Sequence, residues 1–557
     1  MLYLLPVSTN AFGGRWRSVM ALVCGCLLTT SLAPAAEWQW SVELEQVVST
    51  ETKGHPRAFL WIPPNCKKVR AVVVGQHNME EEPILEHAHF RAAQADTDVA
   101  SVWVTPGIDL FFRFDHGAGE RFQEMMVALA KRSGYSELET VPVIPIGHSA
   151  AASFPWNFAA WNPNRTLAVM SISGQFPYYV DDNTPAWEQR TVDGVPGLVT
   201  MGEYEWAAEN LVKGLKIKAA HPGTALSMLA EPGAGHFAPT DDKVDFLAMY
   251  LRTAMHHRLP PGATKLVAID VRTQGWLIDR WHREEAPHAA AAAVGAYKGD
   301  PAEAFWCFDA AQAKATEAFQ ARHRGKKVEV LGYRQGGDLV PQVNGTHQQV
   351  TLAWKPLPDG ISFQLTGDFS DTVPPGRPER WTGQKEGTAI GHASGGGPVT
   401  ITRICGPVRQ TGPDTWALSF YRMGMDNPKR SNDIWFAASH PGDDAYRPMQ
   451  QQAELRFPLR NTSGAEQIIT FPALADQRPE ALPLTLAAKS SSGLPVGYYV
   501  LDGPAEIEAS TLRLTTIPPR SAFPLTVTVV AWQWGRSLEP KLKTAEPVVR
   551  TFHVTGP

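Results

Sequence analysis

One serine in this sequence stands where a reactive hydroxyl would be exposed. The segment "VPVIPIGHSAAASFPWNFAA", residues 141–160, begins as an apolar, strand-like run and continues as a helix-like stretch of small residues. Ser149 lies at the join, between Gly147 and Ala151. A sharp turn there lifts a side chain above the sheet, and only small neighbours fit where the backbones crowd together. The pattern predicts that Ser149 is a nucleophile.

A serine hydroxyl is a weak nucleophile near neutral pH and needs a base that removes its proton. Downstream, the segment "MLAEPGAGHFAPTDD", residues 228–242, places His236 in a glycine-rich loop between a strand-like segment and a helix. A loop of that kind lets an imidazole reach over the edge of a sheet. His236 is therefore the predicted general base.

These two residues need a scaffold, and the sequence from Glu37 to Leu259 supplies one. The segments "VRAVVVGQHN" and "VASVWVTPG" are nearly continuous apolar runs, as in strands that are buried on both faces of a parallel sheet. Helix-like segments such as "ERFQEMMVALAKRSGY" alternate with them. Strands that alternate with helices indicate an α/β fold with a mostly parallel sheet.

The serine at its strand-to-helix join, together with this alternation, resembles the α/β-hydrolase superfamily and its secreted esterases. The usual motif of that superfamily is G-x-S-x-G, and Ala151 replaces the second glycine here. Its nucleophile, acid and histidine follow one another along the chain, which agrees with Ser149 as nucleophile and His236 as base. The resemblance covers residues 37–259 and implies a mechanism rather than a substrate.

The resemblance also implies an acid between these two residues. The segment "GVPGLVTMGEYEW", residues 194–206, ends a strand at Gly202 and then offers Glu203 and Glu205. Similar enzymes carry the acid a few residues beyond such a glycine, so Glu205 is the predicted acid and Glu203 the reserve. The acid is usually Asp, and Glu is a departure from the family's pattern. It would hold the imidazole tautomer and stabilise the imidazolium.

The tetrahedral intermediate of ester hydrolysis needs hydrogen-bond donors for its oxyanion. The resemblance implies the amide of Ala150 as one donor and the amide of Asn78 or Met79 as the other. The usual His-Gly of the second loop is replaced by "QHNM" in this sequence. We interpret the flanking His77 and His148 as positioning or packing residues.

The character of the chain changes after Leu259. Residues 260–325 are predicted to be a linker with an Ala-rich helical extension that runs from "APHAAAAAVG" to "AFQARH". Residues 326–462 contain short strands punctuated by Gly and Pro, which is typical of a β-sandwich. Residues 463–557 resemble bacterial immunoglobulin-like modules. The predicted fold class is an α/β-hydrolase domain followed by β-sandwich-rich domains. Because all predicted catalytic residues precede the linker, a chain that ends near Leu259 is expected to stay active.

The first 36 residues are predicted to be a signal peptide. Arg15 and Arg17 precede the apolar run "VMALVCGCLLTTSLA", and "APAA" offers a cleavage site, which predicts export to the periplasm or the extracellular space without stable membrane insertion. A net charge of -5 without a basic face argues against nucleic-acid binding. The cysteines that remain after cleavage are too widely spaced for a metal cluster, and we expect no metal or cofactor.

The predicted function is that of a secreted serine hydrolase that cleaves carboxylic esters through an acyl-enzyme. Export, eighteen tryptophans and the appended β-rich segments favour an acyl group on a polysaccharide over a lipid. Two alternatives stay open. One is a catalytically degenerate carbohydrate-binding or adhesion protein, and the other is an exopeptidase of the same fold.

Overall fold

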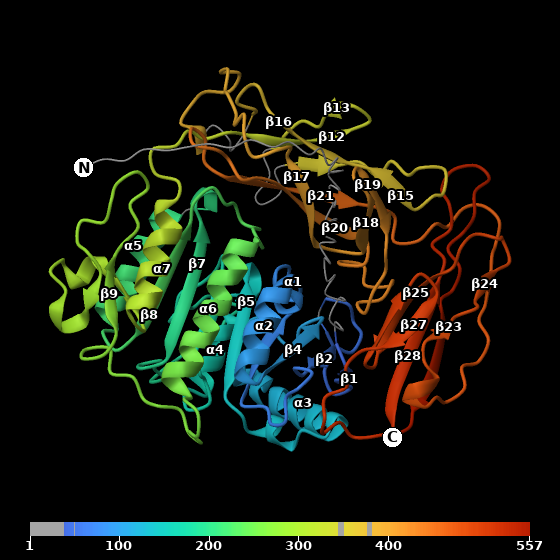
Figure 1. Ribbon diagram of the computed structural model, residues 1–557, viewed down its shortest axis with the longest axis horizontal. Coiled ribbons are helices and arrows are strands. Elements are labelled where there is room, and N and C mark those ends of the chain that lie inside the picture. Colours follow the sequence, from blue (N-terminus) through green and yellow to red (C-terminus); the bar gives the residue numbers. More distant parts are fainter. Residues whose placement is uncertain (1–37, 50, 206, 344–349, 376–380, 557) are drawn as a thin grey trace, which may run out of the picture. The chain divides into compact units, whose positions relative to one another are not determined.

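The computed structural model describes residues 38–49, 51–205, 207–343, 350–375 and 381–556 (Figure 1). The predicted signal peptide, residues 1–36, lies outside these described residues. Within the described ranges, we find no helix with both the length and the apolar character that a membrane crossing needs.

An eight-stranded sheet forms the centre of the first half of the chain, coloured blue to green in Figure 1. Its strand order is β1-β2-β4-β3-β5-β6-β7-β8. Neighbours from β4 to β8 in this order run parallel, whereas β1 and β2 are added antiparallel at one edge. The strands are β1 (Trp40–Glu43), β2 (Arg57–Trp61), β3 (Ala71–Gln76), β4 (Val99–Thr105), β5 (Val143–His148), β6 (Val169–Ile172), β7 (Pro196–Gly202) and β8 (Ala225–Glu231). The predicted α/β-hydrolase fold class is confirmed.

Helices cover both faces of this sheet. They are α1 (Glu81–Glu86), α2 (Ala88–Thr97), α3 (Ala118–Ser133), α4 (Phe154–Trp161), α5 (Ala207–Ala220) and α6 (Asp241–Arg258). Alternate strand residues point to opposite faces, as the pleat requires. Leu198 and Leu229 belong to the apolar cluster that contains α1, α2 and α6 side chains, whereas Val199 and Met228 belong to the one with α4 and α5. Strands buried on both faces explain the continuous apolar runs of the sequence.

The segment 260–325 contains less helix than predicted. Only α7 (Ala310–Ala321) is an α-helix, and it begins where the Asp309 side chain accepts a hydrogen bond from Gln312 N. The alanine run itself holds the short strand β10 (Ala292–Ala293), which pairs with β9 (Trp276–Asp279), and β11 (Ala304–Cys307) pairs with β9 on its other side. Pro287 and Pro301, with glycines between them, interrupt a helix despite the propensity of alanine.

The next part of the chain is β-rich, as predicted, and is built from small sheets. Their orders are β13-β12-β16, β14-β21-β20-β17 and β15-β19-β18. The strands are β12 (Leu331–Gln335), β13 (Asp338–Leu339), β14 (Val350–Leu352), β15 (Ser362–Gln364), β16 (Thr366–Phe369), β17 (Thr400–Cys405), β18 (Val408–Gly412), β19 (Thr415–Leu418), β20 (Asp433–His440) and β21 (Met449–Arg456). Phe363, Trp416 and Phe436 lie in the apolar core that these sheets share.

The last part of the chain is also β-rich. Its sheets have the orders β22-β24, β23-β27-β26 and β25-β28-β29. The strands are β22 (Ile469–Thr470), β23 (Leu484–Thr485), β24 (Lys489–Ser490), β25 (Gly497–Asp502), β26 (Ala505–Glu508), β27 (Thr511–Leu514), β28 (Leu525–Trp532) and β29 (Val548–Val554). Val527 and Phe552 share an apolar cluster with Leu60 and Phe122 of the first half. The C-terminal strands therefore pack against the α/β region and share an apolar core with it.

Candidate active site

Ser149 lies on a sharp turn between β5 and α4. The 3₁₀ turn η3 (Ser149–Ala151) follows β5 directly. Ser149 has a φ of 54°, in the left-handed region that residues other than glycine rarely occupy. A Cβ on Gly147 would overlap the carbonyl oxygen of Ala151, so only glycine fits there. The turn holds the half-buried Ser149 side chain at the end of a buried strand.

His236 lies beside this serine. It belongs to the loop between β8 and α6, and its Nε2 atom is 2.7 Å from Ser149 Oγ. The imidazole is buried, with a residue exposure of 5%. The distance is that of a good hydrogen bond, so His236 Nε2 is placed to take the proton of the hydroxyl.

Glu205 lies on the other side of the same imidazole. It ends the 3₁₀ turn η4 (Glu203–Glu205), which follows β7, and its Oε2 atom is 3.6 Å from His236 Nδ1. Both side chains are buried. The contact is within ion-pair range and longer than a hydrogen bond; such contacts in a site without substrate often tighten in the reacting complex.

Glu203 has different partners. Its Oε2 atom accepts a hydrogen bond of 2.8 Å from Gly233 N, and its Oε1 atom is 3.0 Å from Arg447 Nη1. Arg283 forms a second ion pair with this carboxylate. Of the two glutamates that the sequence left open, Glu205 meets the imidazole in this structure and Glu203 binds arginines of later segments.

The two histidines that flank the site make positioning and packing contacts. His148 is fully buried, and its Nε2–H donates to the backbone oxygen of His236 at 3.0 Å. His77 Nδ1 lies 2.7 Å from Thr105 Oγ1, and its ring packs against Trp103. Burial, reinforced by nearby arginines, lowers the pKa of His77 well below its usual range.

The predicted oxyanion donors differ in their surroundings and in their hydrogen bonds. Ala150 is exposed beside Ser149. Asn78 N and Met79 N instead donate to Glu81 Oε2, at 3.1 and 2.9 Å. This carboxylate is fully buried, and burial raises its pKa to about 7 against the effect of its backbone N–H donors. A substrate oxyanion would have to compete with Glu81 for the amides of the loop after β3.

Glu81 is the middle one of three consecutive buried glutamates that the sequence analysis did not single out. Glu80 accepts a hydrogen bond from Ala238 N, in the His236 loop, and its Oε2 atom lies 2.9 Å from Lys243 Nζ. Lys243 is fully buried and also lies 3.2 Å from Glu231 Oε2. This ionic network joins the loop after β3 to the loop and helix that follow β8.

Glu81 connects the same segment to the serine turn. Its Oε1 atom accepts a hydrogen bond of 2.6 Å from the amide of His148, the residue before Ser149. The run "EEEP", which follows a buried strand, could have predicted the start of a helix here, because acidic residues are favoured in the first turn of a helix. The partners of these side chains could not be read from it.

Side chains of the β-rich segments also reach this site. Phe237 and Met79 belong to one apolar cluster with Trp435 of β20, and the Phe237 and Trp435 ring centroids are 4.8 Å apart. Arg430 Nη2 lies 3.4 Å from Asn78 Oδ1. The residues on both sides of the predicted oxyanion site therefore pack against parts of the chain beyond residue 400.

Glu82 also connects the segment after β3 to the β-rich part of the chain. Its carboxylate accepts from Tyr421 Oη at 3.0 Å and pairs with Arg403 Nη2 at 3.0 Å. A chain that ends near Leu259 would lose these two partners of a buried charge, which is strongly destabilising. The contacts lead us to expect such a chain to be inactive, the opposite of the expectation from the order of the catalytic residues.

No family model and no curated protein matches this chain. Solved structures that align with it include S-formylglutathione hydrolase FrmB of Staphylococcus aureus, at 9% identity over 38% of this chain and 96% of that chain, with a TM-score of 0.28. Est1E of Butyrivibrio proteoclasticus is 15% identical over 39% of this chain and 97% of that chain, with a TM-score of 0.25. LpqC, a poly(3-hydroxybutyrate) depolymerase of Bordetella parapertussis, is 14% identical over 39% and 88%, with a TM-score of 0.26. These scores are low, and the fold assignment rests on the strand order and directions described above.

Proposed function

We propose that this chain is a serine hydrolase that cleaves carboxylic esters through an acyl-enzyme. Ser149 is the nucleophile, His236 the general base and acid, and Glu205 the residue that orients the imidazole. The observation that carries the proposal is the 2.7 Å contact between Ser149 Oγ and His236 Nε2, made from a strained strand-to-helix turn. A serine with a purely structural role needs neither the left-handed backbone nor the adjacent imidazole.

The reaction follows from this geometry. Ser149 Oγ attacks the ester carbonyl while His236 Nε2 takes the hydroxyl proton, and Glu205 stabilises the resulting imidazolium. His236 then gives that proton to the leaving alkoxide, so the alcohol departs and the acyl group stays on Ser149. A water molecule attacks the acyl-enzyme with His236 again as base, and collapse releases the carboxylic acid and restores Ser149.

Ala150 is the proposed first oxyanion donor, since its amide follows the nucleophile and the residue is exposed at the site. The second donor is proposed to be Asn78 N or Met79 N. Either amide can serve only if Glu81 Oε2 gives up its hydrogen bond in the reacting complex. A change of position or protonation of Glu81 is thus part of the proposal.

The substrate is proposed to be a carboxylic ester that reaches Ser149 from solvent. In the part of the chain that the structure describes, no tryptophan is exposed, and large side chains such as Trp103 and Trp156 fill the cores. The tryptophan count therefore does not support sugar stacking. An acyl ester on a polysaccharide is a proposal that rests on the predicted export and on the appended β-rich segments.

Covalent labelling tests the proposal. We expect a fluorophosphonate probe to label the full chain once, with the label mapped to Ser149 by peptide mass spectrometry. Ser149→Ala should abolish labelling and hydrolysis of p-nitrophenyl acetate. Ser153→Ala is the matched control, because Ser153 lies four residues on, is buried, and has no hydrogen-bond partner for its hydroxyl among the described residues.

Three outcomes would contradict the proposal in different ways. A wild-type chain that is neither labelled nor active would favour the degenerate binding protein. Faster turnover of aminoacyl amides than of simple esters would favour the exopeptidase. Labelling that persists in Ser149→Ala would move the nucleophile elsewhere.

A further inference from the structure

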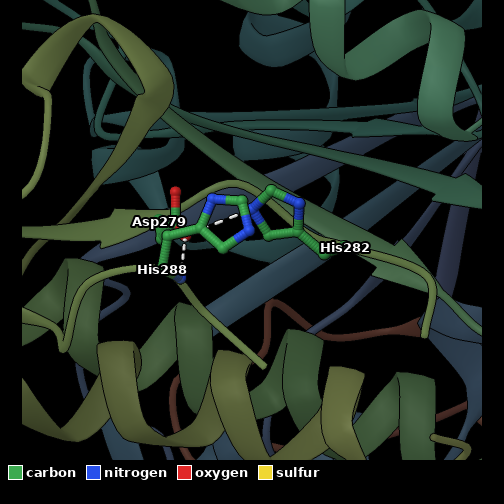
Figure 2. A group of neighbouring side chains, drawn as sticks. All are labelled: Asp279, His282 and His288. Carbon is green, nitrogen blue, oxygen red and sulfur yellow. Dashed lines mark hydrogen bonds and ion pairs between the residues drawn. The ribbon is translucent and has the colours of Figure 1, made fainter. Parts of the chain in front are cut away.

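A second cluster of ionisable side chains lies outside the site described above. Asp279, His282 and His288 each offer one ligand atom, and these three atoms lie within 4.8 Å of one another. Figure 2 shows the carboxylate and the two imidazoles gathered in one place at the end of β9. The proposed ester hydrolysis uses none of them.

The carboxylate is fixed by the backbone around it. Asp279 is the last residue of β9, a strand held between β10 and β11, and the residue is 8% exposed. Asp279 Oδ1 accepts a hydrogen bond of 3.0 Å from Arg280 N, and Oδ2 accepts one from His288 N. One ligand is therefore in place before any ion arrives.

His282 lies at the spacing from the Asp279 carboxylate that a shared ion requires, and His288 packs against the His282 ring with its ligand atom within 4.8 Å of the other two. His282 Nε2 is 3.2 Å from Asp279 Oδ2, and the ring centroids of His282 and His288 are 3.9 Å apart. Two ligands of a tetrahedral zinc ion, each at about 2.1 Å, are roughly 3.4 Å apart. His288 Nε2 also lies 3.2 Å from Glu285 Oε2, which places a further oxygen donor beside the group.

We propose that Asp279, His282 and His288 bind a divalent first-row transition-metal ion, for which Zn²⁺ is the natural probe. Two imidazole nitrogens and one carboxylate oxygen suit zinc and its neighbours. Ca²⁺ and Mg²⁺ take oxygen ligands and do not fit this donor set. Glu285 or water would complete a four-coordinate ion.

Such an ion would close the segment 279–288 on itself. Arg283 lies inside this segment, pairs with Glu203 and donates to Trp381 O at 3.0 Å. The metal would thereby order a loop that contacts the turn η4. The inference stands on the three ligand residues and does not depend on the proposed ester hydrolysis.

Zinc titration of the untagged, full-length protein tests the site. After dialysis against EDTA and then metal-free buffer, isothermal titration calorimetry with ZnCl₂ should show one ion per chain, with a Kd of about 1 µM or lower. His288→Gln should weaken binding at least about tenfold. ZnCl₂ should raise the Tm of the wild type but not of His288→Gln, because an ion that binds only the folded state stabilises it.

His89→Gln is the matched control. His89 is exposed, and its Nδ1 lies 2.7 Å from Asp245 Oδ1, but it belongs to no three-residue cluster among the described residues. Its loss should leave zinc binding unchanged. His288 is itself exposed, so His288→Gln should fold even if Asp279→Asn does not. The absence of saturable zinc binding, equal weakening in His89→Gln and His288→Gln, or equal binding of MgCl₂ would each overturn the proposal.

Discussion

The turn around Ser149 and the segment Glu80–Glu82 both contact the loop that carries His236, yet their chemistry is opposite. The turn is made of small residues, opens to solvent at Ala150 and stores strain in one backbone angle. The glutamates are fully or almost fully buried, and each carboxylate contacts a different part of the chain. The nucleophile is therefore accessible, whereas its position and that of the buried His236 depend on buried charges.

This difference predicts two kinds of mutant. Removing the Ser149 hydroxyl takes one hydrogen bond from His236 but leaves no buried ion without its counter-charge, so the chemical step should be lost while the fold is kept. Neutralising one buried glutamate leaves its cationic or N–H partners without a charge, so stability should suffer first.

The largest effect should come from the serine itself. Ser149→Ala should lower kcat on a small ester by about 10⁶-fold, as for other enzymes that lose a triad nucleophile. Its urea unfolding curve should match that of the wild type, since the side chain is only half-buried. A variant that keeps wild-type turnover would refute the assignment, and one that is inactive because it is unfolded would refute the separation of chemistry from stability.

Of the two glutamates of η4, Glu205 should affect mainly the turnover and Glu203 mainly the stability. Glu205→Gln should lower kcat by about 10⁴-fold, because the imidazolium loses its stabilising charge. Glu203→Gln should keep most of the turnover but lower the Tm, because Arg447 and Arg283 lose a shared buried carboxylate. Stopped-flow or steady-state kcat and thermal unfolding of both variants check this. A larger kcat loss in Glu203→Gln would transfer the role of acid to Glu203.

Sequence reasoning reached the turn and missed the glutamates for a physical reason. The turn is local, because its strand, glycine, serine and helix are adjacent in the chain. Each of them can therefore be recognised from a short stretch of the sequence. The glutamates act through distant partners, such as Lys243, 163 residues from Glu80, and Tyr421, 339 residues from Glu82. No local pattern encodes which positive charge meets which carboxylate.

The segment 260–325 shows the same limit. Alanine propensity predicted one long helix, but prolines, glycines and pairing with β9 gave strands on either side of a loop. The spacing of Asp279, His282 and His288 carries little meaning by itself, since it becomes a cluster only when β9 ends at Asp279 and the chain returns. The alternation of strands and helices in residues 37–259 was predictable from the sequence; side-chain contacts between distant segments were not.

Glu80 offers a direct measure of the buried network. Glu80→Gln should lower the free energy of unfolding by about 3–5 kcal/mol, because Lys243 then keeps one counter-charge among the described residues, Glu231, in a fully buried site. Asp242 lies on α6 next to Lys243 and forms an exposed ion pair with Arg322. Asp242→Asn should therefore lower the free energy of unfolding by less than about 1 kcal/mol. Equal costs in urea unfolding would show that burial adds nothing to this pair. Under conditions in which Glu80→Gln is folded, the variant should still hydrolyse the small ester with a measurable kcat.

The smallest expected effect is a pH dependence that comes from Glu81. Burial raises the pKa of this carboxyl from 4.5 to about 7. Between these values the folded protein retains a proton that the unfolded chain has released. The contribution of Glu81 to the free energy of unfolding is therefore fully present below pH 4.5, and it is lost as the pH rises through about 7. The loss should amount to ~3 kcal/mol.

Glu81→Gln isolates this contribution, because the amide resembles the protonated carboxyl and cannot titrate. The variant should be destabilised at low pH by whatever hydrogen bonds it fails to remake with Asn78 N, Met79 N and His148 N. Above pH 7 the difference from the wild type should shrink or reverse, since only the wild type pays for a buried charge. Free energies of unfolding from urea titrations at several pH values would show this convergence. Parallel profiles would mean that the three amides keep Glu81 ionised throughout, and the second oxyanion donor would then have to come from elsewhere than Asn78 and Met79.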